Sequence, residues 1–193
     1  MKQWLITDTH FGHKNIAEYT NRPEGWEDMI IDNLSVVEEG DIIYHLGDFA
    51  LREHAKWAKR YHDALPNDVC SVLIKGNHDG KSKHWYLNHG FTVVDDWAVA
   101  LGYVEDESHA FILSHKPLDI SKRVGVSANF HGHFHNAPID RWKPGLRKLA
   151  LRPDHYLLVL EDVGYRPVPL RYVIDEWWKP IKKIDAVERH WRE

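Results

Sequence analysis

Short apolar runs alternate with polar residues and glycines along the chain, and their spacing predicts a series of strands and helices. Helical spacing of apolar residues predicts helices over residues 26–38, 52–65 and 82–88, and over 175–192 with a break at Pro180. Apolar stretches of strand length occupy residues 3–7, 41–46, 69–75, 91–94, 97–101, 110–114, 127–131, 156–161 and 168–173.

The order of these segments predicts the fold class. Strand and helix alternate in the early part of the chain, whereas the later part is strand after strand, which indicates an α/β protein with mixed sheets. Five of the predicted strands end in short runs that contain Asp, Asn or His. Sites in α/β folds form where the carboxyl ends of strands meet loops, so the sequence predicts one cleft fed by five strand ends.

Composition narrows the function classes. The chain has 193 residues, which favours a single domain over residues 1–193, and 43% apolar residues are enough for a substantial core. One cysteine, Cys70, excludes a disulfide framework and a thiolate-rich zinc module. The N-terminus lacks the apolar run of a signal peptide, and no segment is long and apolar enough for a membrane helix, so we expect a soluble, cytoplasmic protein.

Charge and histidine content point in different directions. The formal net charge of −4 argues against a nucleic-acid binder that works by bulk positive charge. Histidine, however, occurs 15 times, about one residue in thirteen. These imidazoles are the unusual feature of the composition, and their positions carry the functional argument.

Metal-ligating residue types fill the five strand ends. Each end supplies oxygen or nitrogen donors suited to a divalent transition metal, and an i, i+2 pair on an extended segment projects both side chains to one side. Seven donors exceed the needs of one tetrahedral ion and fit two, with Asp48 as a candidate bridge. Two carboxylates against two divalent cations leave a site of about +2, which suits a phosphate ester. The clusters are Asp8-Thr9-His10, Gly47-Asp48, Gly76-Asn77-His78-Asp79, His115 and Gly132-His133-Phe134-His135.

This ordered set resembles the calcineurin-like metallophosphoesterase superfamily over residues 8–135. The run from Asp8 to Ile16 is similar to the small, cap-less bacterial and phage members. The resemblance implies a four-layer α-β-β-α sandwich of two mixed sheets flanked by helices. It also implies two divalent transition-metal ions, with Mn as the expected metal and Fe, Zn, Ni or Co as alternatives.

The resemblance implies a role for each matched residue. One ion would be held by Asp8, His10, Asp48 and His135, and the second by Asp48, Asn77, His115 and His133, with Asn77 ligating through its amide oxygen. His78 matches the catalytic histidine, which contacts the phosphate and protonates the leaving oxygen. The nucleophile would be a metal-bound hydroxide that attacks in line with the leaving group.

One position departs from the pattern of the superfamily's protein Ser/Thr phosphatases. Those enzymes carry Gly-Asp-x-x-Asp-Arg-Gly, whereas this chain has Leu51 in place of the second Asp and retains Arg52. His78 must then be oriented by another group, for which Asp79 or a backbone carbonyl is a candidate. Because the chain also lacks room for the extra sheet and loops of that branch, we do not expect a protein phosphatase.

The remaining candidates have less specific signals. Arg52, His13 and Asn15 are candidate substrate contacts beside the predicted centre. His45 and His131 are expected to be hydrogen-bonded neighbours of the ligands, and the other histidines to be surface or packing residues. Three tryptophans are expected in the core, and of the adjacent Trp177 and Trp178 one is expected to cover a sheet. The three core tryptophans are Trp4, Trp57 and Trp97.

A basic stretch over residues 141–152 is open to two interpretations. A solvated loop is the default, and a basic lip that guides a nucleotide or polynucleotide is the sharper alternative. Lys81 and Lys83 could serve the same end. The cations of the stretch are Arg141, Lys143, Arg147, Lys148 and Arg152.

Three function hypotheses follow. The leading one is a dinuclear metal-dependent phosphoesterase that acts on small phosphoesters, nucleotide-like mono- or diesters, with His78 as general acid. The second is a nuclease that acts on single-stranded nucleic acid with the same metal centre. The third is a metal-binding scaffold with a degenerate site. The sequence predicts no membrane partner and leaves the substrate, the ester preference and the oligomeric state open.

Overall fold

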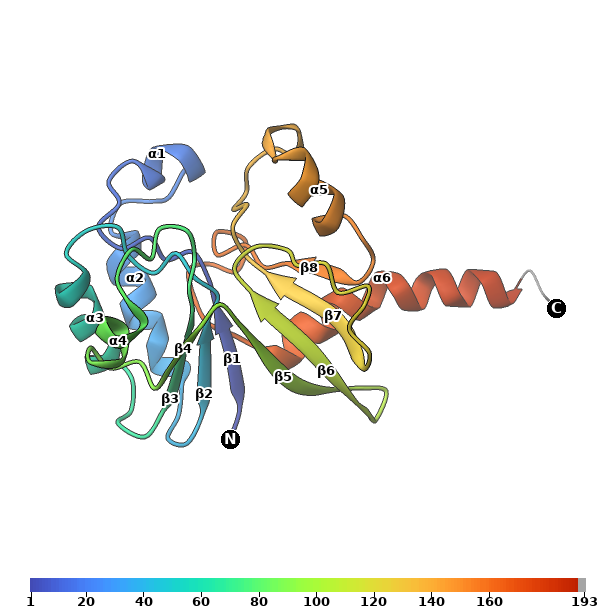
Figure 1. Ribbon diagram of the computed structural model, residues 1–193, viewed down its shortest axis with the longest axis horizontal. Coiled ribbons are helices and arrows are strands. Elements are labelled where there is room, and N and C mark those ends of the chain that lie inside the picture. Colours follow the sequence, from blue (N-terminus) through green and yellow to red (C-terminus); the bar gives the residue numbers. More distant parts are fainter. Residues whose placement is uncertain (191–193) are drawn as a thin grey trace.

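A five-stranded mixed sheet forms the first part of the fold (Figure 1). The computed structural model describes residues 1–190, and side chains for residues 1–181. The first four strands, β1 to β4, run parallel to one another, and β9 pairs antiparallel with β1 at the edge of the sheet. The strand order is β4-β3-β2-β1-β9. The strands are β1 (Gln3–Ile6), β2 (Ile42–His45), β3 (Cys70–Ile74), β4 (Val93–Asp95) and β9 (Val168–Pro169).

Helices cover the outer face of this sheet. Ile30 of α2 and Trp57 and Tyr61 of α3 are buried with Ile43 and Leu73 of the strands in one apolar cluster. A short helix, α1, lies in the loop that follows β1. These helices are α1 (Ile16–Thr20), α2 (Trp26–Asn33) with the 3-10 turn Leu34–Val36, α3 (His54–Asp63) and α4 (Lys83–Leu87).

The second sheet has four strands in the order β5-β6-β7-β8. β5 pairs antiparallel with β6, whereas β6, β7 and β8 are mutually parallel. The carboxyl ends of β6 and β7 are level, because Ser114 pairs with His131. The strands are β5 (Trp97–Val104), β6 (Glu107–Ser114), β7 (Val126–His131) and β8 (His155–Leu157).

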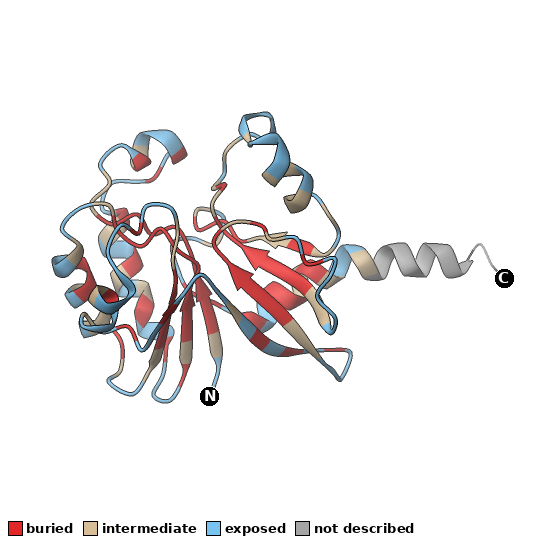
Figure 2. Cartoon of the chain, in the orientation of Figure 1, coloured by how far each residue is buried: buried red, intermediate tan, exposed pale blue. Residues whose placement is uncertain are grey.

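The two sheets enclose a second apolar cluster. Leu5 and Val72 from the first sheet are buried with Phe111 and Phe130 from the second. α6 (Leu170–His190) closes this cluster, and its Trp177 ring lies edge-on to Phe111 at 5.7 Å between centroids. Buried segments accordingly line the space between the sheets in Figure 2. The predicted α/β architecture of two mixed sheets with flanking helices is confirmed.

The C-terminal third corrects three predicted elements. Residues 168–173 are not one strand, because α6 begins at Leu170 and buries Val173 and Ile174 at helical spacing. The helix also continues through Pro180, which is exposed, so the predicted break does not occur. The predicted strand over residues 156–161 is shorter, since β8 ends at Leu157.

Two smaller predictions are also wrong. The stretch 141–152 is not simply a loop, because α5 (Pro144–Ala150) occupies most of it, with Pro144 in the first turn, where a missing N–H costs no hydrogen bond. Trp97 is 41% exposed rather than in the core, because it lies on the outward face of β5, where the Arg123 guanidinium covers its ring. None of the helices among the described residues has the length and apolar character of a membrane span.

Candidate metal centre

The five polar strand ends meet at one place. β1, β2 and β3 are parallel neighbours, so the loops that follow them lie at the same edge of the first sheet. The loops after β6 and β7 approach the same edge, since the backbone N–H of His133 donates to Asp8 Oδ2 at 3.0 Å. All seven residues predicted as ligands are therefore neighbours, as the sequence predicted. Three sets of donor atoms lie within 4.8 Å of one another: Asp8/His10/His135, His10/Asp48/His78 and Asp48/His115/His133.

One group of donors combines Asp8, His10 and His135. The Nε2 atoms of the two imidazoles lie 3.1 Å apart. Asp8 Oδ1 lies 3.8 Å from His10 Nε2 and 3.6 Å from His135 Nε2. The side chains of Asp8 and His10 are buried, and that of His135 is largely buried. This group corresponds to the first predicted ion site.

A second group of donors surrounds His115. Its Nε2 atom lies 3.2 Å from Asp48 Oδ2, 3.2 Å from Asn77 Oδ1 and 3.1 Å from His133 Nδ1. Asp48 Oδ2 also lies 3.5 Å from His10 Nε2, which belongs to the first group. A single carboxylate oxygen thus faces both groups, the position that a bridging ligand requires.

Each aspartate divides its two oxygens between the backbone and the centre. Asp48 Oδ1 accepts the His78 backbone N–H at 2.8 Å, and its Oδ2 faces the imidazoles. Asp8 Oδ2 accepts from the Thr7 hydroxyl and from the His133 N–H. Asp8 Oδ1 is buried and has no hydrogen-bond donor among the described residues. A buried carboxylate oxygen without a donor is costly unless a cation neutralises it, so this donor set fits a metal.

The ligand loops have unusual backbone geometry. Five of the seven predicted ligands lie in the left-handed region of φ, which non-glycine residues seldom adopt. The i, i+2 pairs therefore do not sit on extended segments, as the sequence argument assumed, because the strands end before the ligands. The side chains converge because the chain turns sharply at each ligand, and such strained positions cluster at functional sites. The φ values are 51° at Asp8, 49° at His10, 55° at Asp48, 81° at His133 and 51° at His135.

Two glycines leave room for the carboxylates. A Cβ on Gly76 would overlap Asp48 Oδ1, and a Cβ on Gly132 would overlap Asp8 Oδ2 and Thr7 Oγ1. These are the glycines of the Gly-Asn-His-Asp and Gly-His-x-His motifs. Glycine is needed at these positions because the backbone passes close to a carboxylate. Gly76 has no positive φ, so conformational freedom is not the reason there.

Burial and charge set the protonation of the imidazoles. Burial lowers the pKa of His10 to about 2 and that of His133 to about 3, so both are neutral at pH 7. Burial also opposes a charge on His115, but its hydrogen bond to Asp48 and the charges of Asp8 and Asp48 raise its pKa to about 9. Because a metal ligand must be neutral imidazole, a cation would have to displace the proton of His115.

Arg22 and Glu161 support the centre from behind, and the sequence argument missed both. Glu161 Oε1 lies 3.4 Å from His135 Nδ1 and accepts two hydrogen bonds from the buried guanidinium of Arg22. Arg22 also donates to the backbone carbonyls of Asp8 and Thr9. A carboxylate on the second nitrogen of a ligand histidine fixes its ring and tautomer. Glu161 ends a predicted strand, the same signal that identified the other clusters.

His78 lies at the open side of the centre. Its side chain is 40% exposed, its Nε2 lies 4.0 Å from Asp48 Oδ2, and its ring lies edge-on to His10 at 5.1 Å. Asp79 does not orient it, which corrects one of the sequence expectations. The buried Asp79 carboxylate instead accepts from the backbone N–H groups of Asp48, Phe49 and Gly76 and from the hydroxyl of Tyr86. Asp79 therefore joins two of the ligand loops.

The other candidates differ in position. His13 is near the centre, with its ring 5.5 Å from that of His10 and 6.1 Å from that of His78. Arg52 lines a cavity of about 390 Å³ together with His13. Asn15 is exposed, and no described contact brings its side chain to the centre.

Two further histidines are buried near the ligands, as expected. His45 Nε2 lies 2.9 Å from the Thr9 hydroxyl, and its Nδ1 accepts the Gly47 N–H. His131 lies in the core at the end of β7 and belongs to none of the three donor sets. Burial lowers the pKa of each to about 3.

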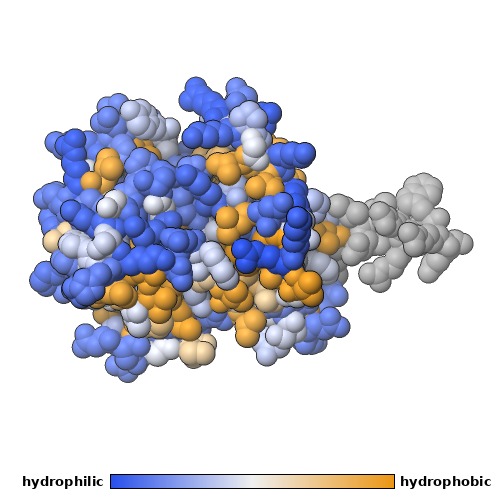
Figure 3. Space-filling view, in the orientation of Figure 1, coloured by the Kyte–Doolittle hydropathy of each residue, from blue (hydrophilic) through white to orange (hydrophobic). Residues whose placement is uncertain are grey.

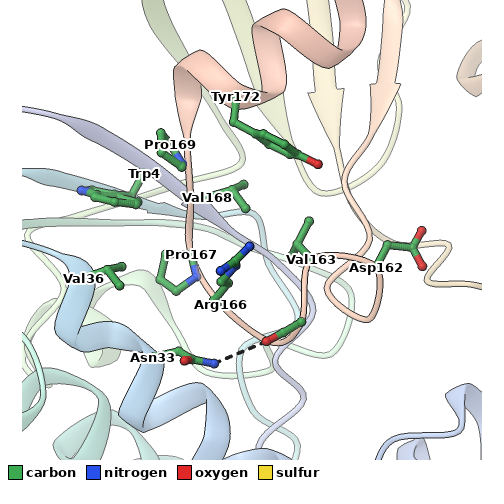
Figure 4. A pocket seen from close by; sticks show the side chains of 11 residues that line it. Trp4, Asn33, Val36, Asp162, Val163, Arg166, Pro167, Val168, Pro169 and Tyr172 are labelled. Atoms are coloured by element: carbon green, nitrogen blue, oxygen red, sulfur yellow. Dashed lines mark hydrogen bonds between the residues drawn. The ribbon is translucent and has the colours of Figure 1, made fainter.

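A separate cavity of about 640 Å³ lies at the β9 edge of the first sheet (Figure 4). Asn33 closes one side of it by donating to the Gly164 carbonyl. Arg166 and Asp162 are the charged side chains that line it, and none of the three donor sets includes a residue of its wall. The three donor sets therefore lie apart from this cavity, at the strand ends.

Comparison with known proteins places this fold and sequence. No family model matches the chain. Among solved structures, the protein of unknown function AQ665 from Aquifex aeolicus shares the fold, with a TM-score of 0.63, 23% identity, and coverage of 91% of this chain and 98% of that one. A nuclease MPE from Pseudomonas putida matches with a TM-score of 0.41 and 24% identity over 69% of this chain and 61% of its own.

A curated relative shows the family. The uncharacterized protein MJ1445 from Methanocaldococcus jannaschii is 30% identical over 183 residues, which cover 90% of this chain and 89% of the relative. Identity at this level over nearly the full length of both chains indicates common descent and the same fold. The chain therefore belongs to the same protein family as MJ1445.

Proposed function

We propose that this chain is a dinuclear metal-dependent phosphoesterase of the calcineurin-like superfamily. The observation that carries the proposal is the position of Asp48 Oδ2, which lies 3.5 Å from His10 Nε2 and 3.2 Å from His115 Nε2, the nearest imidazole of each donor group. The sharp turns at the ligands and the unpartnered Asp8 Oδ1 support the same conclusion. A structural role alone would not explain a buried carboxylate that lacks a donor.

The donor groups define what would be bound. Asp8, His10, Asp48 and His135 would hold one ion, and Asp48, Asn77, His115 and His133 the other. When bound, two divalent cations act as Lewis acids on a phosphoryl oxygen and make deprotonated water available near neutral pH. Imidazole, carboxylate and amide donors without thiolate suit Mn²⁺ first among the metals considered, with Fe, Zn, Ni or Co as alternatives.

The side chains around the donor groups would handle the substrate. His78, which is partly exposed beside Asp48, would contact the phosphate and give a proton to the leaving oxygen. Arg52 and His13 line the adjoining cavity and would neutralise and orient the phosphate. In the overall reaction, water adds its oxygen to phosphorus, the P–O bond to the leaving group breaks, and the leaving oxygen gains a proton.

Chelation and reconstitution test this proposal. We expect the purified protein to hydrolyse bis-p-nitrophenyl phosphate or p-nitrophenyl phosphate, to lose that activity in a chelator, and to regain it with Mn²⁺. A protein with the ligand substitution Asp8→Asn serves as the control for a contaminating hydrolase. Undiminished turnover after chelation, or none with Mn²⁺, Fe²⁺, Ni²⁺, Co²⁺ or Zn²⁺, would contradict the proposal. A metal-binding scaffold would bind the ions and give no turnover.

A further inference from the structure

Cationic side chains without a partner gather in the loops that carry the predicted ligands. Lys14, Arg52 and Lys116 follow His10, Asp48 and His115 closely in sequence. Their side chains make no hydrogen bond or ion pair with any described residue, whereas several cations far from the centre do, as in Lys2–Glu38, Lys59–Asp63 and Lys179–Glu176. The chain is acidic overall, so these three cations are a local excess of positive charge beside the centre.

A basic arm, residues 139–152, adds to this excess. It comprises the 3-10 turn Ile139–Arg141 and α5, none of whose residues is buried. The Trp142 ring stacks on Phe134, between His133 and His135, with centroids 4.1 Å apart and planes at 7°, and its Nε1 donates to the Ala137 carbonyl. The arm is thereby attached to the ligand loop itself. Four of its cations have no hydrogen-bond or ion-pair partner among the described residues: Arg141, Lys143, Arg147 and Lys148.

Two separate cavities lie beside the centre. One, of about 260 Å³, is lined by Asn77, His115 and Lys116. The other, of about 390 Å³, is lined by His13, Lys14 and Arg52, together with Glu27, which accepts the Gly12 N–H, and the paired Glu53 and Lys56. A terminal phosphate monoester needs space and charge on one side of the scissile bond only. An unpaired cation in each cavity, and a further set on the basic arm, suit a substrate with several phosphates.

An exposed aromatic ring faces the same region. Tyr19 of α1 is 69% exposed, and its ring lies 6.3 Å from that of His13. The carbonyl of its neighbour Thr20 accepts from the Asn136 side chain at 2.9 Å, so α1 is joined to the loop that follows His135. Figure 1 shows α1 and α5 on either side of the strand ends, and Figure 3 shows the hydrophilic surface over both. An exposed aromatic beside a cationic surface is how proteins stack unpaired bases.

We propose that the substrate is a single-stranded nucleic acid whose backbone crosses the centre, with flanking phosphates on the basic arm and a base on Tyr19. The inference rests on the proposed function and extends it from small esters to a polymer. Water would add to phosphorus, one bridging P–O bond would break, and the products would be a terminal phosphate monoester and a strand with a free hydroxyl. Local rather than bulk positive charge explains how a protein of net charge −4 would bind a polyanion.

Binding and turnover of a 20-nucleotide oligo-dT test this inference on the full chain. Equilibrium binding would be measured by fluorescence anisotropy in a chelator, and kcat/KM with Mn²⁺. We expect K143A/R147A/K148A to weaken binding about tenfold or more, and to reduce the salt slope by about 2, since each phosphate contact contributes about 0.7 for single strands. The same variant should lower the preference for oligo-dT over bis-p-nitrophenyl phosphate about tenfold. Tyr19→Leu should weaken binding by about fivefold or more without changing the salt slope.

The matched control is K2A/K59A/K179A, which removes the same charge from ion-paired sites away from the centre and should leave binding and the substrate preference unchanged. Equal loss in both triple variants, or tighter binding of a duplex than of the single strand, would overturn the inference. So would a higher kcat/KM for mononucleotides than for oligo-dT. If the unaltered protein with Mn²⁺ turns over neither oligo-dT nor the small diester, the proposed function itself is overturned. The two failures are therefore distinguishable.

Discussion

The two sheets contribute to the centre in different ways. The loops of the first sheet supply both carboxylates, one amide and one imidazole, and backbone bonds such as Asp8 N–H to the Gly47 carbonyl tie them together. The loops of the second sheet supply imidazoles, and contacts such as His115 Nδ1 to the Leu46 carbonyl at 2.9 Å and the His133 N–H to Asp8 Oδ2 at 3.0 Å join them to the first-sheet loops. The first sheet therefore fixes the anionic part of the centre, and the second closes it with imidazoles.

This difference has a physical origin. A carboxylate offers two oxygens, so one can be held by a backbone N–H while the other stays available to a cation, as in Asp48. An imidazole offers its second nitrogen to an outer partner, as His135 does to Glu161. Loss of the Asp48 carboxylate should therefore affect both donor groups, whereas loss of a second-sheet imidazole should affect one.

Asp48→Asn tests this contrast with the largest expected effect. Because Asp48 Oδ2 faces both donor groups, its replacement should lower bound metal below one ion per chain. Turnover should fall by more than about 100-fold, which exceeds the loss typical when a group that only supports a metal ligand is replaced. His133→Asn is the comparison from the second sheet and should retain one ion. Metal content by mass spectrometry after gel filtration is the measurement. Equal occupancy in the two variants would remove the bridging role of Asp48.

His78→Ala separates the chemistry from the metal. His78 lies beside the donor groups and is partly exposed, so its removal should lower kcat by about 10²- to 10⁴-fold, the range for a general acid, with metal content unchanged. A leaving group of low pKa needs less protonation, so the loss should be smaller for p-nitrophenyl esters than for alkyl esters. Unchanged kcat for the alkyl ester would show that His78 is not the acid.

Glu161→Gln tests the support of the second-sheet imidazoles. Gln keeps the shape but loses the charge that holds His135, so metal affinity should fall by about 10- to 100-fold. The readout is Mn²⁺ affinity by isothermal titration calorimetry, which does not depend on turnover. Glu53→Gln, at an exposed surface pair with Lys56, is the control. An affinity equal to that of the control would mean that Glu161 serves only to hold Arg22.

The smallest expected effect is that of His45→Gln on how the free energy of unfolding depends on pH. Burial lowers the pKa of His45 to about 3 in the folded protein, whereas in the unfolded chain it titrates near 6.5. Between these values only the unfolded state binds the proton, so the contribution is full above pH 6.5 and lost as pH falls, by about 1.4 kcal/mol per unit. Urea unfolding in a chelator at pH 7 and pH 5 should show a shallower fall for His45→Gln than for the parent, by about 2 kcal/mol over this range. Identical falls would mean that His45 is protonated when folded.

The sequence predicted the layout better than the local geometry. Strand ends with Asp, Asn or His led to all seven donors, because parallel pairing brings the carboxyl ends of β1, β2 and β3 to one edge whatever the loops do. The left-handed turns at Asp8 and His133 were not predictable, since they depend on contacts with loops distant in sequence. Glu161 and Arg22 escaped for the same reason, because they lie 139 residues apart.

The errors in the C-terminal third have a related cause. Residues 168–173 have the composition of a strand, but Leu170, Val173 and Ile174 are also spaced for one helix face, and the apolar cluster between the sheets selects the helix. The error at Trp97 is of the opposite kind, because the strand was predicted and the exposure of the side chain was not. An aromatic residue on a strand was expected to be buried, yet period-2 alternation places it on the outward face of β5.

The central claim is that one carboxylate serves two ions, and anomalous diffraction from crystals grown with Mn²⁺ measures it most directly. The account predicts two manganese peaks, one among Asp8, His10 and His135 and one among Asn77, His115 and His133, with Asp48 between them. A single peak, or two peaks of which only one contacts Asp48, would contradict it.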